Sequence, residues 1–344
     1  MSLTASMTLR KSYNNDMLYD FQKNLLNNIK PNYIIAADTG TGKTIMAIHH
    51  YLKHNNGEPL LVVAPPAKIR EGGWDREIEF VANHYGIQIS YDLMSYGVLA
   101  KKWMHYKGWF VVFDECHYVK NPTSQRGKAA INLTKNSTNF LLLSATPSAN
   151  GWEDTIAYMI MFGFFKNKTQ FLREHAIYEK KYFGPSPVNI VVGWKNEKKL
   201  KYLYQSISVK LSKDECLDLP DLVFDDIYFN VSDEYRTIQK TRVLNNVLYD
   251  TTMSLQHGLR FYANQKDKLK YTEMLAESTE ENIVVFYYYQ KEKEKLIEKL
   301  KNKTIYEVSG KTTNLPNKNN WPKLKNTVTL VQYQAGSSGI ELQY

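Results

Sequence analysis

Cysteine is scarce in this sequence, with only Cys116 and Cys216 among 344 residues. Two thiols are too few for a disulfide framework, and no cluster with metal-ligand spacing accompanies them. Long apolar runs are missing too, since the stretch from Ile283 to Tyr289 falls far short of the roughly 18 residues that a membrane span requires. The start of the chain has no signal-peptide pattern. These absences argue against a disulfide-rich secreted domain and a membrane protein, and they predict a soluble, cytoplasmic protein.

Acidic side chains are outnumbered by basic ones, which gives a formal net charge of +9 and a pI of about 9.1. Such a balance suits a polyanionic partner such as nucleic acid, which releases counterions on binding. Most of the positive charge is lysine, however, and asparagine and tyrosine are also plentiful. This composition equally fits an AT-rich genome, such as that of a low-GC bacterium or its phage. Charge alone therefore leaves both explanations open.

Short, wholly apolar segments recur along the chain. Strands with two buried faces are typical of parallel sheets covered by helices on both sides, and the intervening stretches are long enough for crossover helices. The pattern predicts a doubly wound α/β architecture, in which ligands sit at the carboxyl ends of the strands. The segments are Tyr33–Ala37, Leu60–Ala64, Trp109–Phe113, Phe140–Leu143, Ile283–Phe286 and Thr327–Val331.

The length suits two domains, each able to bury a core. Four apolar segments lie early in the chain and two lie late, with a different composition between them. We predict a first lobe over residues 1–165, a Lys-rich helical connector over 166–222 and a second lobe over 223–344. Asn196–Lys210 in the connector is helix-like, and residues 233–277 have helical periodicity with few breakers.

A glycine-rich loop follows the first apolar segment, with the sequence Asp38-Thr39-Gly40-Thr41-Gly42-Lys43-Thr44. A strand before it and a helical stretch, Ile45–Lys53, after it are the setting of a phosphate-binding loop. Backbone N–H groups from Thr39 to Gly42 would face a phosphate at the positive end of the helix dipole. Lys43 would reach the β and γ phosphates, and Thr44 would hold magnesium. The first position of the usual pattern is Ala37 instead of glycine.

An acidic pair, Asp114 and Glu115, ends the third apolar segment and is followed by Cys116 and His117. Behind a phosphate loop, Asp114 is placed to bind the hydration shell of magnesium, and Glu115 to polarise the attacking water as a general base. His117 has no second histidine or cysteine at ligand spacing. We expect it to bond across to the next strand end, Ser144-Ala145-Thr146.

Taken together, these residues resemble the superfamily-two helicases with DEAD/DEAH-box-like motifs, and within them the Swi/Snf-type DNA translocases. Their order and spacing carry the resemblance, because motifs Ia, IV and V are individually no more than apolar strands with loops. The matching stretches are Leu18–Gln22 (Q motif), Ala37–Thr44 (motif I), Leu61–Pro66 with Trp74 and Glu77 (motif Ia), Asp114–His117 with Lys120-Asn121-Pro122 (motif II), Ser144–Pro147 with Asn150 (motif III), Ile283–Phe286 (motif IV) and Gly336–Leu342 (motif V).

The resemblance also implies roles for single residues. Gln22 would read the adenine edge, and His117 with Ser144, Ala145 and Thr146 would link the ATP state to the grip on nucleic acid. From motif V, Gly339 and Glu341 would contact the nucleotide. The implied nucleic-acid contacts are Pro65, Pro66, Lys68, Lys120, Asn121 and Ser337.

Two departures from the family pattern stand out. Motif III has Ala145 where Swi/Snf members carry glycine, which is closer to the wider helicase pattern. Motif VI, which supplies arginine fingers, is absent, and no arginine follows Arg260. We therefore expect a second lobe that is cut short, and a chain that binds ATP far better than it hydrolyses it, because such a finger is worth roughly 10³ to 10⁵ in rate.

The resemblance implies two RecA-like P-loop NTPase lobes with parallel sheets, which bind ATP and Mg²⁺ in the cleft between them. The leading hypothesis is a DNA-dependent ATPase that translocates on duplex DNA or remodels forks in replication, recombination or repair. Duplex or forked DNA is a more plausible partner than RNA, replication or repair proteins are further candidates, and no membrane is expected. The oligomeric state is left open.

Four alternatives remain at this point. A strand-separating helicase is the closest, followed by an RNA helicase. A nucleotide-gated switch would use ATP to change nucleic-acid partners without movement. The chain could also be the motor subunit of a restriction system, although its residues show no nuclease constellation.

Overall fold

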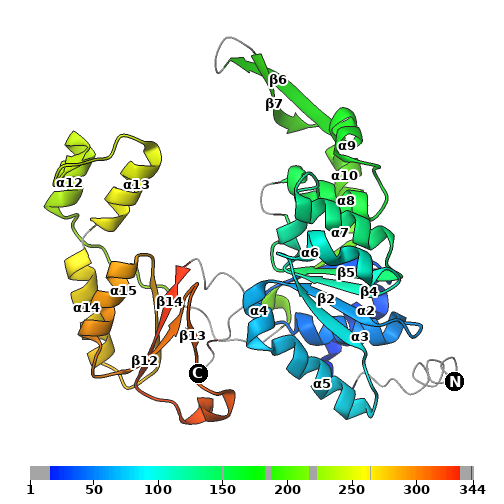
Figure 1. Cartoon of the computed structure of the whole chain (residues 1–344), viewed down its shortest axis with the longest axis horizontal. Coiled ribbons are helices and arrows are strands. Elements are labelled where there is room, and N and C mark those ends of the chain that lie inside the picture. Colours follow the sequence, from blue (N-terminus) through cyan, green and yellow to red (C-terminus); the bar gives the residue numbers. More distant parts are fainter. Residues whose placement is uncertain are drawn as a thin grey trace. The chain divides into compact units, whose positions relative to one another are not determined.

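The structure is a computed structural model, and it describes residues 16–148, 151–182, 187–216, 223–263, 265–333 and 342. The chain divides into two compact units, Met1–Pro220 and Asp221–Tyr344 (Figure 1). Each unit is an α/β assembly with a sheet of its own.

The first unit is built on a six-stranded sheet in the order β3-β2-β4-β5-β1-β8. Every pairing in it is parallel. Strands β2 and β4 are buried along their whole length, as their uninterrupted apolar sequences require. The strands are β1 (Tyr33–Ala37), β2 (Leu60–Ala64), β3 (Tyr91–Ser95), β4 (Phe110–Asp114), β5 (Asn139–Ser144) and β8 (Ser208–Leu211).

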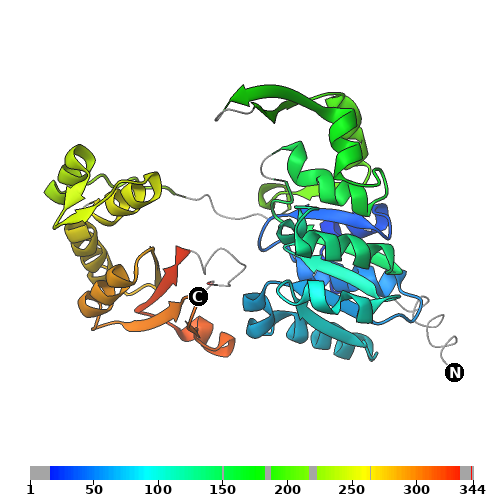
Figure 2. The same ribbon diagram turned by 45° about the horizontal axis from the view of Figure 1, so that its top comes forward.

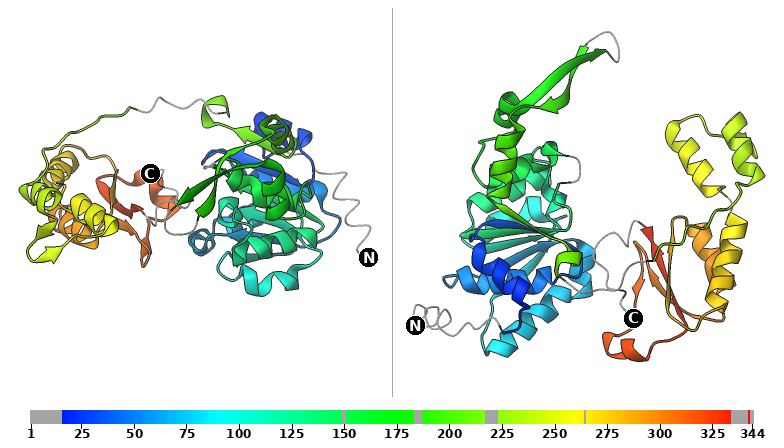
Figure 3. Two further views of the ribbon diagram at one scale, coloured as in Figure 1. Left: turned by 90° about the horizontal axis from the view of Figure 1, so that it is seen from above. Right: turned by 180° about the vertical axis from the view of Figure 1, so that it is seen from behind.

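Helices cover both faces of this sheet (Figure 3), so alternate residues of one strand enter different cores. Val111 and Phe113 of β4 pack in one buried cluster, whereas Phe110 and Val112 pack in the other. The helices of this unit are α2 (Asp20–Asn28), α3 (Lys43–His54), α4 (Pro66–Glu71), α5 (Gly73–Tyr85), α6 (Leu99–Lys102), α7 (Gln125–Lys135), α8 (Ile156–Met161), α9 (Lys168–His175), α10 (Glu197–Gln205) and α11 (Lys213–Cys216).

The four strands expected in the first lobe are present, each within one residue of the predicted bounds. The expected helical connector over 166–222 requires correction. It contains an antiparallel hairpin, β6 (Ala176–Tyr182) with β7 (Pro187–Trp194), which projects from the rest of the unit (Figure 2). The helix-like stretch 196–210 divides into α10 and β8. Strand β8 then pairs with β1, so this segment belongs to the first unit's sheet.

The second unit has a four-stranded sheet in the order β11-β14-β12-β13. Strands β11, β14 and β12 are parallel, and β13 runs antiparallel to β12. Helices α14 and α15 lie along one face (Figure 1), where Leu269, Leu296 and Leu330 share a core. The strands are β11 (Ile283–Tyr287), β12 (Thr304–Val308), β13 (Thr313–Asn314) and β14 (Thr327–Gln332), and the helices are α14 (Gln265–Glu277) and α15 (Gln290–Lys299).

Strands β11 and β14 confirm the two late apolar segments, but β11 is not buried on both faces as expected. Val284 is 39% exposed and Phe286 is 48% exposed. The helical region 233–277 also differs in part, because a short hairpin separates its helices. The region comprises α12 (Asp233–Thr241), β9 (Val243–Leu244), β10 (Val247–Leu248), α13 (Thr252–Phe261) and α14, the helix that precedes β11.

Candidate active site

The glycine-rich loop joins β1 to α3, and the side chain of its own Lys43 bonds to its backbone carbonyls. Gly40 and Gly42 have φ angles of +88° and +79°, which favour glycine. The Lys43 ammonium donates to the carbonyl oxygens of Ala37 at 2.7 Å and Asp38 at 3.0 Å. Burial lowers the pKa of Lys43, and the nearby Glu115 carboxylate opposes that shift. The structure thus holds a buried cation at the start of a helix, the combination that suits a phosphate.

Gln22 braces this loop from α2. Its amide nitrogen donates to the carbonyl of Thr41 at 2.9 Å, and its amide oxygen accepts from the backbone N–H of Tyr19 at 2.9 Å. A Cβ at Gly42 would lie 2.4 Å from the Gln22 amide nitrogen, so a larger residue there would displace the Gln22 side chain from the loop. Gln22 therefore supports the loop, and its contact with adenine stays a prediction. Of the other loop residues, Thr39 is exposed and Thr44 half-buried.

The acidic pair lies at the carboxyl end of β4. Asp114 is 1% exposed, and one of its carboxylate oxygens accepts from the Trp74 indole N–H and the Lys68 ammonium, each at 3.0 Å. Glu115 follows in the left-handed region with φ of +55°, an unusual conformation for a residue other than glycine. Such strain is concentrated at functional sites.

Glu115 contacts two cationic or potentially cationic groups. Its oxygens lie 3.5 Å from Lys68 Nζ and 3.4 Å from His117 Nδ1. Burial alone would raise the pKa of Glu115, but the hydrogen bond from His117 and the charges of Lys68 and Lys43 outweigh it and lower that pKa. Glu115 is therefore held ionised, the state that a general base needs.

His117 connects this pair with the end of β5, as expected. Its Nδ1 lies 3.2 Å from the Ser144 hydroxyl oxygen, which also accepts from the backbone N–H of Thr146 at 3.2 Å. Ala145 is half-buried between them. The contact across the strands is confirmed, whereas its coupling role stays a prediction.

Several expected nucleic-acid contacts have partners inside the first unit. Lys68 pairs with the acidic residues, and Lys120 pairs with Asp154 at 2.9 Å. The side chain of Asn121 accepts from Thr123. Pro65 is buried and Pro66 begins α4 exposed. Contacts of these residues with DNA stay predictions.

The remaining expected site residues lie outside the described residues. They are Asn150 near motif III, and Ser337, Gly339 and Glu341 of motif V.

Lys213 is a neighbour of the loop that sequence reasoning missed. Its backbone N–H donates to the Asp38 carboxylate at 3.0 Å, and a Cβ on Gly40 would lie 3.3 Å from Lys213 Cε. Pairing of β8 with β1 brings it there from far along the sequence. The sequence signal for it was weak, a short segment over residues 207–211 in which apolar and polar residues alternate. A second missed feature is the indole hydrogen bond of Trp74 to Asp114.

These residues fit a magnesium-bound nucleotide. In the described part of the chain no group of three or more His, Cys, Asp or Glu side chains could hold a metal. Mg²⁺ is commonly held by one or two carboxylates together with phosphates and water. Asp114 and the Thr44 hydroxyl would hold it, and Lys43 would contact the phosphates.

Comparison with known proteins identifies the family. The model of the SNF2-related domain matches residues 81–282, more than half of the chain. The chain belongs to the SNF2-related family. Members of this family are ATP-dependent DNA translocases and remodellers, and the resemblance to Swi/Snf-type translocases is confirmed. The matched range holds the acidic pair and its partner at Ser144, while the phosphate loop precedes it.

The SWI2/SNF2 ATPase core of Sulfolobus solfataricus, solved in complex with dsDNA, is similar to the chain with 18% sequence identity and a TM-score of 0.48. The similarity covers 92% of this chain and 78% of that one. No curated protein matches this SNF2-related chain. None of the helices in its described part combines the length and apolarity that crossing a bilayer requires.

Proposed function

We propose that this SNF2-related chain is the motor of a DNA-dependent ATPase that moves along duplex DNA or remodels forks, in replication, recombination or repair. The observation that carries the proposal is the placement of the phosphate loop and the acidic pair. They follow β1 and β4, the two neighbours of β5 in one parallel sheet. Strand β5 ends in Ser144, the partner of His117. The three motifs thus meet at one sheet edge, where α/β proteins bind ligands.

The residues divide the reaction among them. Lys43 neutralises the phosphates, and Asp114 with Thr44 positions the metal. Glu115, held ionised by its neighbours, accepts a proton from water. Bound magnesium and ATP would supply charge neutralisation and the transferable phosphoryl group. A change at Glu115 would pass through His117 to Ser144 and the loop beyond β5, which supports a coupling role for that loop.

The second unit supplies the other half of the proposed motor. Its parallel strands β11, β14 and β12 support its assignment as the second RecA-like lobe, over the proposed residues 223–344. Alternate closure and opening of the two lobes would move them along a DNA strand through contacts with the DNA backbone. DNA is the proposed track, and replication or repair proteins are proposed partners.

ATP turnover of wild-type protein and of Glu115→Gln tests this proposal. It is measured at fixed salt without nucleic acid and with single-stranded DNA, duplex DNA, forked DNA or RNA. Duplex or forked DNA should stimulate the wild type most, and Glu115→Gln should lose 10²-fold or more of the stimulated rate. Glu79→Gln, an exposed glutamate on α5, should keep it. Turnover that ignores every nucleic acid would replace the motor with an ATP-gated switch.

A further inference from the structure

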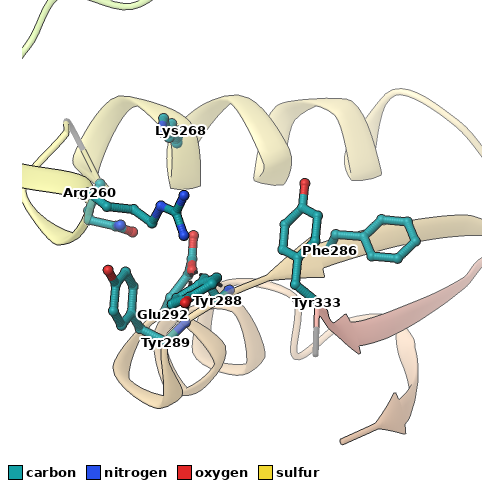
Figure 4. A pocket seen from close by; sticks show the side chains of 8 residues that line it. Arg260, Lys268, Phe286, Tyr288, Tyr289, Glu292 and Tyr333 are labelled. Carbon is teal, nitrogen blue, oxygen red and sulfur yellow. Dashed lines mark hydrogen bonds between the residues drawn. The ribbon is translucent and has the colours of Figure 1, made fainter. Parts of the chain in front are cut away.

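The second unit contains a cavity that no part of the proposed ATP site uses. It has a volume of about 520 Å³, within the ~300–1,000 Å³ typical of small-molecule sites. Its walls come from α13, α14, α15, the last part of β11 and the residues that follow β11 and β14, so it lies at the carboxyl ends of two adjacent parallel strands. Figure 4 shows Arg260 directed toward Tyr288, with Phe286 and Tyr333 beside each other at the other end.

Aromatic rings form much of the wall. The Arg260 guanidinium lies over the Tyr288 ring, 4.6 Å from its centroid, and the rings of Phe286 and Tyr333 lie 5.5 Å apart. Phe286 is 48% exposed and Tyr333 is 59% exposed. Exposed planar groups of this kind offer stacking surfaces for a flat ring.

The framework behind these rings is held in place. Tyr289 donates its hydroxyl to the carbonyl of His257 at 3.0 Å, and its ring packs on Phe261, which attaches α13 to the end of β11. The Glu292 carboxylate accepts from the backbone N–H groups of Tyr288 and Tyr289 at 3.0 and 3.4 Å. The pocket is therefore a built feature of the unit.

The charged side chains of the pocket wall indicate which kind of aromatic ligand the pocket would bind. Arg260 and Lys268 are cationic and Glu292 is anionic, so the wall carries an excess of one positive charge. This excess disfavours a cationic ligand such as a methylated amine and favours an aromatic ring that bears a phosphate. The side-chain oxygen of Gln265 is buried and has no hydrogen-bond partner in the described part of the chain. It lines the pocket and would accept from an N–H of a nucleobase.

We propose that this pocket binds one unstacked nucleotide of a DNA strand, with its base against the aromatic wall and its phosphate near Arg260 and Lys268. The inference rests on DNA being the substrate of the motor, and it specifies which DNA. A base inside an intact duplex is stacked and cannot enter, so the pocket favours single strands and forks over duplex. Stacking is tolerant of sequence, so the pocket gives no base-specific reading.

The test uses the full chain, a dT oligonucleotide that contains one 2-aminopurine, and a blunt duplex of equal length, at several salt concentrations without ATP. Tyr288→Ala and Phe286→Ala should weaken single-strand binding about 5- to 150-fold, the factor that corresponds to one lost stacking contact. Their duplex affinity should change less than twofold. Tyr288→Phe, which keeps the ring, should bind like wild type. Because Phe286 is half-exposed, its variant tests the pocket without loss of folding.

Lys268→Ala and Lys270→Ala form a matched pair on α14, since only Lys268 lines the pocket and both are exposed. Lys268→Ala should reduce the salt dependence of single-strand binding by about 0.7 in the log–log slope, and Lys270→Ala should not. The 2-aminopurine fluorescence should be quenched by wild type and not by Tyr288→Ala.

If Tyr288→Ala and Phe286→Ala both kept the single-strand affinity of wild type, the proposed nucleotide site would be wrong. An equal loss of single-strand and duplex binding would contradict it too. Quenching with free 2-aminopurine mononucleotide, but not within the oligonucleotide, would overturn the strand assignment in favour of a free nucleotide. Wild-type protein that binds no DNA and whose turnover ignores DNA would instead defeat the proposed motor. The two failures are therefore distinguishable.

Discussion

At the scale of single residues, a buried histidine on α3 has a hydrogen-bond partner at only one of its two ring nitrogens in the described part of the chain. His50 on α3 is buried, and its Nε2 lies 2.9 Å from the Pro31 carbonyl oxygen, to which it donates in the neutral ring. Burial lowers the pKa of His50 to about 3, with small contributions from the charges of His54 and Lys53 and against the hydrogen bond to Pro31, which raises it. An unfolded histidine titrates near ~6.5. Folding therefore excludes a proton that the unfolded chain accepts below that pH.

This difference predicts a stability loss in mild acid. The contribution of His50 is fully present above about pH 6.5 and falls as pH decreases toward 3, by about 2 kcal/mol at pH 5. His50→Gln should therefore show a shallower decline of unfolding free energy between pH 7 and pH 5. Urea unfolding at both pH values, compared between variant and wild type, measures it, and equal declines would contradict the shift.

At the scale of elements, the turn after the acidic pair is fitted to α7 through one glycine. A Cβ at Gly127 would lie 1.9 Å from the carbonyl oxygen of Asn121, and Ser124 caps the helix through the Gly127 N–H at 3.0 Å. The same turn carries Lys120, which pairs with Asp154. The lysine-asparagine extension thus packs the end of β4 onto α7.

Gly127→Ala should destabilise the protein by about 1–3 kcal/mol, because backbone on both sides must shift to relieve the overlap. The free energy of unfolding, measured with urea, checks this. Gly310→Ala is the control, since a Cβ there meets nothing within 4 Å and its φ is ordinary. A Gly127→Ala variant as stable as that control would show that the backbone of the turn can shift without a cost in stability.

At the scale of the whole molecule, the first unit is complete only when β8 is included. Strand β8 pairs with β1 over Ile34 to Ala37, and α10 buries Leu200 in the core. A fragment that ends at residue 165 leaves the β1 edge unpaired directly before the phosphate loop.

A fragment of residues 1–216 should therefore fold and bind a fluorescent ATP analogue, whereas residues 1–165 should aggregate or bind at least tenfold more weakly. Cooperative urea unfolding and nucleotide titration of both fragments measure this. Equal nucleotide affinity would show that β8 is dispensable for the loop.

The same scale shows what the sequence could predict. Strands β1, β2, β4 and β5 were predictable because their apolar runs need burial on two faces, and the His117–Ser144 contact followed from their order. The pairing of Lys68 with Asp114 could not be predicted, because it depends on how α4 is placed in space. The contact of Lys68 with nucleic acid stays a prediction. Lys213 was missed because only long-range strand pairing brings it near the loop. The exposed face of β11 was missed because apolar periodicity does not say which faces the helices cover.

The pairing of β8 with β1 also has a mechanical consequence. Helix α11 follows β8 directly, and the first unit ends at Pro220, soon after α11. Tension applied to α11 would load the parallel β1–β8 ladder along the strands, so that its hydrogen bonds share the force. The Lys213–Asp38 contact would deliver part of it to the first residue of the phosphate loop. Force applied to the carboxyl end of β8 would thus reach the phosphate loop.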